Sequence, residues 1–105
     1  MKTFNVNNIQ LKMQSPSVRI SSDLLNYIIS HIEKLGNTYS RIKKCELIFK
    51  NENDSQNNNC VAEIKLFVPQ NVIFAKDHCN NFRLAFKNVF DDLYEQLKKI
   101  KEKSA

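Results

Sequence analysis

The residues best suited to binding chemistry lie in the last quarter of the chain, over residues 82–103. Apolar residues recur there at steps of three and four, which predicts one long amphipathic helix. At about 100° per residue, a second set falls along one flank of the apolar stripe: Arg83, Lys87, Tyr94, Lys98 and Lys101. Cations beside an aromatic ring suit the phosphates and bases of a polyanion, so this flank predicts RNA binding.

The same flank also has an interpretation that involves no ligand. Lysines near a helix C-terminus complement the helix dipole by roughly 0.3–1 kcal/mol each, and they keep a protein soluble. Tyr94 has two interpretations as well, because its ring could stack on a base or lie half-buried at the edge of the apolar stripe. The residues by themselves leave both alternatives open.

Length and charge set broad limits on the protein. With 105 residues and 42% hydrophobic residues, the chain predicts a single folded domain, which we place at residues 9–105 after a polar lead at 1–8. The formal net charge of +5 favours an anionic partner without deciding the fold. No apolar run is long enough for a signal peptide or a membrane span, so we expect a cytoplasmic protein with no membrane partner.

Residues that could catalyse a reaction or hold a metal are scattered along the chain. The cysteines and histidines are Cys45, Cys60, Cys79, His31 and His78, with no spacing that brings three or four ligands together. The single glycine, Gly36, provides no glycine-rich loop for a phosphate. An acidic group, Asp91, Asp92 and Glu95, fits a solvated helix face better than a catalytic site. We therefore expect no enzyme, no metal, no cofactor and no small-molecule substrate.

The first half of the chain alternates between strand and helix periodicity. Ile9, Leu11 and Met13 alternate with polar residues, which predicts a half-buried strand that ends at Pro16. The run 21–23 (SSD) then predicts a helix N-cap with an acidic first turn. Apolar spacing continues to residue 35, and Gly36 with Asn37 predicts the C-cap.

The second half begins with strand patterns. Period-two runs at 42–50 and 61–68 predict two strands, joined by a long, mobile hairpin loop at the polar segment 51–59. Residues 69–71 (PQN) predict a type I turn before a short strand at 72–75, and 77–81 lead into the last helix. The order β-α-β-β-β-α predicts an α+β, two-layer sandwich: a four-stranded mixed sheet with two helices packed on one face.

Three segments give the chain a family resemblance. They are LLNYIISHIEKLGNTYSRI at 24–42, VAEIKLFVPQNVIFAKD at 61–77 and NFRLAFKNVFDDLYEQLKKIKEK at 81–103. In order and spacing the chain resembles the short form of the ribosome hibernation promoting factor family, also called ribosome-associated inhibitor or sigma-54 modulation proteins. The resemblance implies a translation inhibitor that binds the small ribosomal subunit and its rRNA, occludes the mRNA and tRNA decoding region, and acts under stress.

The resemblance also implies which residues contact rRNA. By position these are Lys34, Arg41, Lys76, Lys98, Lys99, Lys101 and Lys103. The chain departs from the family pattern at Gln70, Lys87 and Glu95, where relatives carry Gly, an acidic residue and a basic residue. Because the chain ends after the last helix, we expect a monomer off the ribosome that does not pair ribosomes by itself. Alternative interpretations are a generic double-stranded RNA-binding domain, or a protein–protein adaptor that uses Ile48 and Phe67 on an open sheet face.

Overall fold

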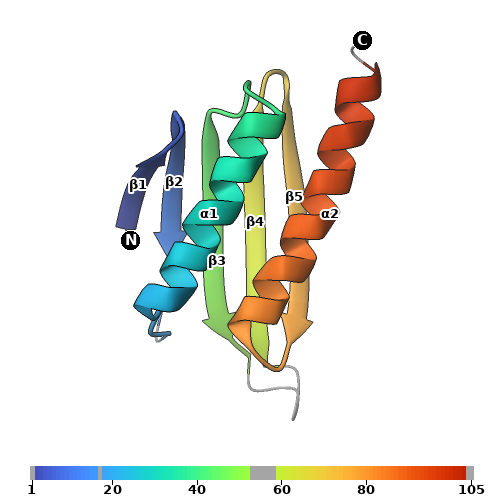
Figure 1. Ribbon diagram of the computed structural model, residues 1–105. Helices are drawn as coiled ribbons and strands as arrows, with labels where there is room; N and C mark the ends of the chain where they lie inside the picture. Colours follow the sequence, from blue (N-terminus) through green and yellow to red (C-terminus); the bar gives the residue numbers. More distant parts are fainter. Residues whose placement is uncertain (1, 17, 53–58, 104–105) are drawn as a thin grey trace.

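The computed structural model describes residues 2–16, 18–52 and 59–103, with side chains up to residue 100. Its elements are β1 (Lys2–Val6), β2 (Ile9–Gln14), α1 (Ser22–Thr38), β3 (Lys44–Asn51), β4 (Cys60–Val68), β5 (Asn71–Cys79) and α2 (Phe82–Lys103). Both helices lie on the same face of one sheet and run in the same direction (Figure 1). This confirms the two-layer α+β architecture. No helix among the described residues is both long and apolar enough to cross a membrane.

The sheet has five strands in the order β1-β2-β3-β4-β5, so the prediction of four strands is wrong. β2 and β3 are parallel because α1 connects them as a crossover. The other neighbours are antiparallel hairpin partners. The strand pairing therefore follows the expected meander, extended by one strand at the β2 edge.

The additional strand is β1, which the sequence interpretation treated as a polar lead. Phe4 lies opposite Leu11 of β2, and Val6 is buried opposite Ile9. Asn7 and Asn8 form the two-residue turn with φ of 50° and 68°, as a type I′ hairpin turn requires. Residues 2–6 belong to the fold, because they pair with β2 along the whole of β1 and direct Phe4 and Val6 inward.

The expected end of α1 at Gly36 is also wrong. The helix begins as predicted, because the Ser21 hydroxyl accepts a hydrogen bond from the Leu24 amide at 3.1 Å. It then continues through Gly36 to Thr38. A Cβ atom on Gly36 would lie 2.9 Å from the Asn7 side-chain nitrogen, so this glycine lets α1 approach the β1–β2 turn.

Two details of β5 differ from the prediction. The strand extends over nine residues, including part of the segment expected to lead into α2. In the preceding turn Gln70 has φ of 64°, which fits the third position of a type II turn after Pro69 and excludes type I. The long loop predicted at 51–59 is flanked by β3 and β4, but its residues 53–58 lie outside the described residues.

The core lies between the sheet and the two helices. Alternate residues of β3 and β4 point into it, with Leu47, Phe49, Ile64 and Leu66 almost fully buried. Cys45 lies in the same layer, where burial and the nearby Glu46 raise the pKa of its thiol to about 12. The thiol therefore stays protonated and acts as a small apolar side chain.

Candidate nucleic-acid interface

Aromatic rings connect α1 to α2. The Tyr27 ring of α1 lies edge-on to Phe86 of α2, with 6.0 Å between centroids. The His31 ring, one turn further along α1, meets Phe90 edge-on at 4.8 Å. Phe86 and Phe90 belong to the buried stripe of α2, so these contacts fix the spacing of the helices from the core outward.

Around these rings, the two helices present a row of cations and aromatic side chains to solvent. Lys34 lies two helical turns after Tyr27 and therefore on the same side of α1. On α2, Arg83 of the flank predicted from sequence faces α1, with its guanidinium over the Tyr27 ring at 4.2 Å. We call this surface the interhelical face; its residues are Tyr27, His31, Lys34, Arg83, Lys87, Tyr94 and Lys98.

The Tyr94 ring lies half-buried at the edge of the apolar stripe, as one of its two interpretations predicted. Its ring is partly buried and nearly parallel to Phe90, with centroids 6.1 Å apart and an interplanar angle of 27°. The Lys98 ammonium lies 5.3 Å from the centre of the same ring. One side of the Tyr94 ring thus packs against Phe90, and the Lys98 ammonium lies next to the exposed part of the ring. These contacts hold the ring in place, and stacking of a base or ribose on it stays a prediction.

Two of these cations form ion pairs with carboxylates on α2. The Lys87 ammonium lies 2.6 Å from Asp91, and the Lys98 ammonium lies 3.8 Å from Glu95. The hydrogen bond from Lys87 to Asp91 raises the pKa of the lysine, so Lys87 is charged at neutral pH. Exposed ion pairs on a helix surface contribute little to stability, so a phosphate can replace the carboxylate at little cost.

The structure places the remaining predicted contact residues in different regions. Arg41 is exposed in the turn between α1 and β3, and Lys99 is exposed on α2. Both lie toward the end of the molecule where α1 and α2 finish (Figure 1). Lys76 projects from the opposite face of the sheet, 4.0 Å from Glu52, and does not join the interhelical face. The side chains of Lys101 and Lys103 lie outside the described part of the chain.

Sequence reasoning missed Tyr27 and His31 as members of this surface. Their spacing of four residues, beside the buried Ile28 and Ile32, was the available signal. The His31 Nδ1 donates a hydrogen bond to the Tyr27 carbonyl oxygen at 2.8 Å, which fixes the ring against α2. The sequence alone did not determine which flank of α1 faces α2, because this depends on how both helices pack on the sheet.

The side of the sheet that points away from the helices differs from the interhelical face. We call it the outer sheet face. It bears Lys12, Lys44, Glu46, Ile48, Lys50, Glu63, Lys65, Phe67, Val72, Phe74, Lys76 and His78, which point away from the helices. Here Lys44 pairs with Glu46 at 3.1 Å and Lys50 with Glu63 at 3.0 Å. Phe74 and Val72 are about half exposed. Among the described residues, no group of three His, Cys, Asp or Glu side chains could hold a metal ion.

A comparison with models of known protein families identifies the family of this chain. The family model described as "Sigma 54 modulation protein / S30EA ribosomal protein" matches residues 11–105. The chain belongs to this family. It is thus a member of a ribosome-associated family, as the sequence resemblance predicted. A comparison with curated proteins gave no match.

Solved structures share the fold at low sequence identity. A ribosomal subunit interface protein from Coxiella burnetii superimposes with a TM-score of 0.75 at 17% identity, covering 88% of this chain and 97% of that one. The N-terminal domain of Protein Y from Thermus thermophilus gives a TM-score of 0.71 at 15% identity, covering 85% and 94%. At these identities the similarity establishes the fold alone. Which partner this protein contacts depends on its own side chains.

Proposed function

We propose that this family member binds the small ribosomal subunit through rRNA and blocks translation by occupying the mRNA and tRNA decoding region. The observation that carries the proposal is the interhelical face, where Lys34, Arg83, Lys87 and Lys98 accompany aromatic rings held by the core. Phosphates bind such lysines and arginines through charge-assisted hydrogen bonds. This function requires tight binding at a site that mRNA and tRNA also need, and it involves no catalytic turnover.

The acidic neighbours on α2 determine how the surface would engage RNA. Lys87 and Lys98 would exchange Asp91 and Glu95 for phosphates, whereas Arg83 and Lys34 have no ion pair among the described residues. Arg83 keeps a fixed position through Tyr27, which reduces the entropy lost when its guanidinium binds. Lys34, Arg41, Lys98 and Lys99 would extend the contact toward the C-terminal ends of the helices, with Lys101 and Lys103 beyond them.

Co-sedimentation tests this proposal. The purified protein is centrifuged with small ribosomal subunits and, in parallel, with free duplex RNA, at low and high salt. We expect retention by subunits that weakens as salt rises, and far weaker retention by the duplex. Equal capture by both would instead support a generic double-stranded RNA-binding domain, and salt-independent capture would support a protein–protein adaptor.

Matched substitutions then locate the contact. Lys34→Gln with Lys98→Gln removes one charge from each helix, and we expect about a tenfold loss of subunit affinity, equal to about 1.4 kcal/mol. The control, Lys12→Gln with Lys65→Gln, removes the same total charge from the outer sheet face and should change affinity less than twofold. An equal loss from both pairs would show that only net charge matters and would reject the interhelical face as the binding surface.

A further inference from the structure

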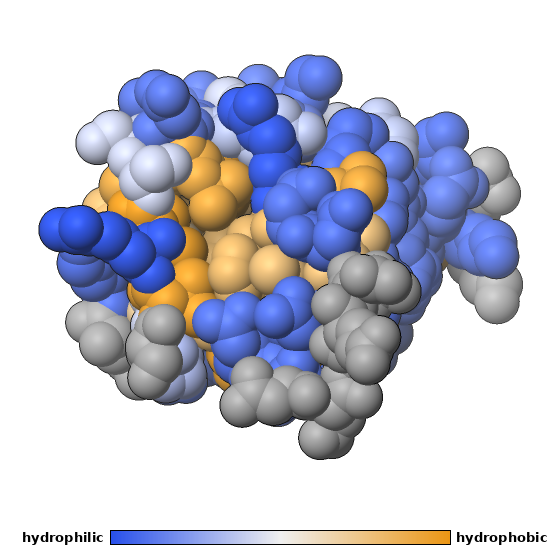
Figure 2. All heavy atoms as spheres, turned by 90° about the horizontal axis from the view of Figure 1, so that it is seen from below, coloured by the Kyte–Doolittle hydropathy of each residue, from blue (hydrophilic) through white to orange (hydrophobic). Residues whose placement is uncertain are grey.

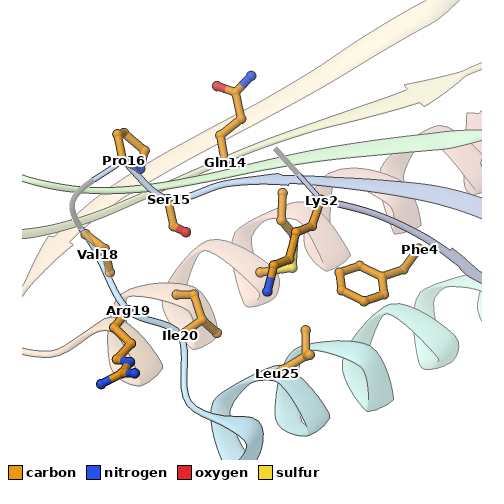
Figure 3. Close-up of a pocket in the computed structure, with 10 residues that line it drawn as sticks. Lys2, Phe4, Gln14, Ser15, Pro16, Val18, Arg19, Ile20 and Leu25 are labelled. Atoms are coloured by element: carbon orange, nitrogen blue, oxygen red, sulfur yellow. The ribbon is translucent and has the colours of Figure 1, made fainter.

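A cavity of about 620 Å³ opens at the end of the molecule where α1 begins. It lies between the β1–β2 hairpin, the segment that follows β2, and the first turns of α1 (Figure 3). Figure 2 looks onto this end and shows apolar surface gathered in its middle, bordered by hydrophilic side chains. Its volume is within the range of about 300–1,000 Å³ that is usual for small-molecule sites.

Apolar side chains from separate parts of the chain form its walls. Phe4 comes from β1, Met13 from β2, Ile20 from the segment before α1, and Leu25 from the first turns of the helix. Phe4, Ile20 and Leu25 point into the same space (Figure 3) and are only partly buried, although each also packs against the core. A ligand with an apolar body would remove these side chains from water, which is favourable by about 25 cal/mol per Å².

A cation enters this apolar space without a counter-ion. Lys2 is exposed, and its side chain extends from β1 toward Ile20 and Leu25, so that its ammonium lines the open cavity (Figure 3). Arg19 stands at the mouth with its guanidinium turned outward. Neither cation has an ion pair within the described residues, and none of the described lining residues is acidic. The charge of this site therefore favours a single anionic group.

We propose that this cavity binds a small amphiphilic monocarboxylate, with its carboxylate on Lys2 and its apolar body against Phe4, Met13, Ile20 and Leu25. A nucleobase fits less well, because its polar edge needs several hydrogen-bonding partners, and besides the cations only the Ser15 hydroxyl points toward the cavity (Figure 3). Gln14, the one amide among the lining residues, points away from the cavity (Figure 3). The cavity shares no residue with the interhelical face, so this site does not depend on ribosome binding.

Calorimetric titration of the whole protein tests the site, with decanoate as the probe below its micelle-forming concentration. Decan-1-ol is the matched neutral probe, because it has the same chain without the charge. We expect one decanoate to bind per protein, and decan-1-ol to bind at least tenfold more weakly. Lys2→Gln should weaken decanoate binding about tenfold and leave decan-1-ol binding unchanged, since it removes the charge and keeps most of the side chain.

Two further variants separate the cavity from the rest of the surface. Ile20→Trp fills the cavity and should abolish binding of both probes, with circular dichroism confirming that the variant is folded. Lys65→Gln removes a lysine from the outer sheet face and should change neither titration. The proposal is overturned if the two probes bind equally, if Lys2→Gln has no effect, if several decanoates bind without saturation, or if wild-type protein binds no decanoate at millimolar concentration.

Discussion

The interhelical face and the outer sheet face both carry lysines and aromatic rings, but they hold them differently. On the outer sheet face, Lys50 pairs with Glu63, whose side chain is only 18% exposed. On the interhelical face, Lys87 pairs with Asp91, whose side chain is 56% exposed. The sheet carboxylates are held by neighbouring strands, whereas the helix carboxylates stand in solvent beside flexible lysines.

The aromatic rings show the opposite arrangement. Tyr27 and Tyr94 on the interhelical face contact the buried rings of Phe86 and Phe90, so their positions are fixed from below. On the outer sheet face, Phe74 is 48% exposed. On the interhelical face the aromatic rings are therefore fixed, and the lysines can easily leave their carboxylate partners. Both properties favour binding to an RNA backbone. The outer sheet face combines exposed apolar groups with several cations that pair with carboxylates, namely Lys44, Lys50 and Lys76.

The largest expected difference between the two faces concerns stability. Phe86→Ala should lower the free energy of unfolding by about 3–5 kcal/mol, because it leaves a cavity beneath Tyr27 and His31. Phe74→Ala, on the outer sheet face, should cost less than about 1 kcal/mol. Urea denaturation followed by circular dichroism measures both. Similar losses for the two variants would mean that the rings of the interhelical face are not anchored by the core.

The salt dependence of subunit binding should also distinguish the faces. Arg83→Gln should reduce the log–log slope of affinity against salt by about one unit, because it removes one phosphate contact. Lys65→Gln should leave the slope unchanged. Binding measured by fluorescence anisotropy between low and moderate salt gives both slopes. A change of slope for Lys65→Gln as large as for Arg83→Gln would place RNA on the sheet instead.

Removing carboxylates provides a smaller and more specific test. Asp91→Asn with Glu95→Gln should tighten subunit binding about three- to fivefold, because Lys87 and Lys98 no longer give up exposed carboxylate partners when they bind phosphate. The matched control, Glu46→Gln with Glu63→Gln, changes net charge equally on the outer sheet face. It should tighten binding less than twofold, and an equal gain from the control would contradict the difference in pairing.

The smallest expected effect is on the pH dependence of stability. Hydrogen bonds to Asp91 and Glu63 raise the pKa values of Lys87 and Lys50 above 10.5 in the folded protein. Each pair therefore stabilises the fold from neutral pH up to about pH 10, and this contribution disappears as pH rises through the raised pKa of the lysine. Comparing the denaturation midpoints of Lys87→Gln and Lys50→Gln with wild type should show differences that persist to about pH 10 and then shrink.

The more enclosed sheet pair should give the larger of these two differences below pH 10, since its carboxylate is less accessible to solvent. If the Lys87→Gln difference were the larger, the helix carboxylate would be the more firmly held, and the contrast between the faces would be lost.

Most elements could be predicted because their apolar periodicity agrees with their final environment. The stripe of α2, with Phe86, Leu93 and Leu97, is buried as its spacing indicates. The predicted flank beside this stripe meets α1 at Arg83, which lies over Tyr27. The rRNA contacts assigned to this flank and to the other family positions stay predictions.

The errors have local and long-range causes. β1 was missed although Phe4 and Val6 alternate with polar residues before an Asn-Asn turn, a signal that the polar composition of the segment concealed. The end of α1 could not have been found locally. Gly36 has the residue type of a C-cap, but its role is to let the helix approach Asn7.

The sequence by itself determined the periodicity of the helices and of four strands, the basic flank of α2 and the family, because these depend on residues that are neighbours along the chain. Only the tertiary structure decided that Lys76 projects from the other side of the sheet, that Tyr27 accompanies Arg83, and that Lys2 enters an apolar cavity. Such placements depend on how strands register and how helices pack, and these are set by contacts between residues far apart in the chain.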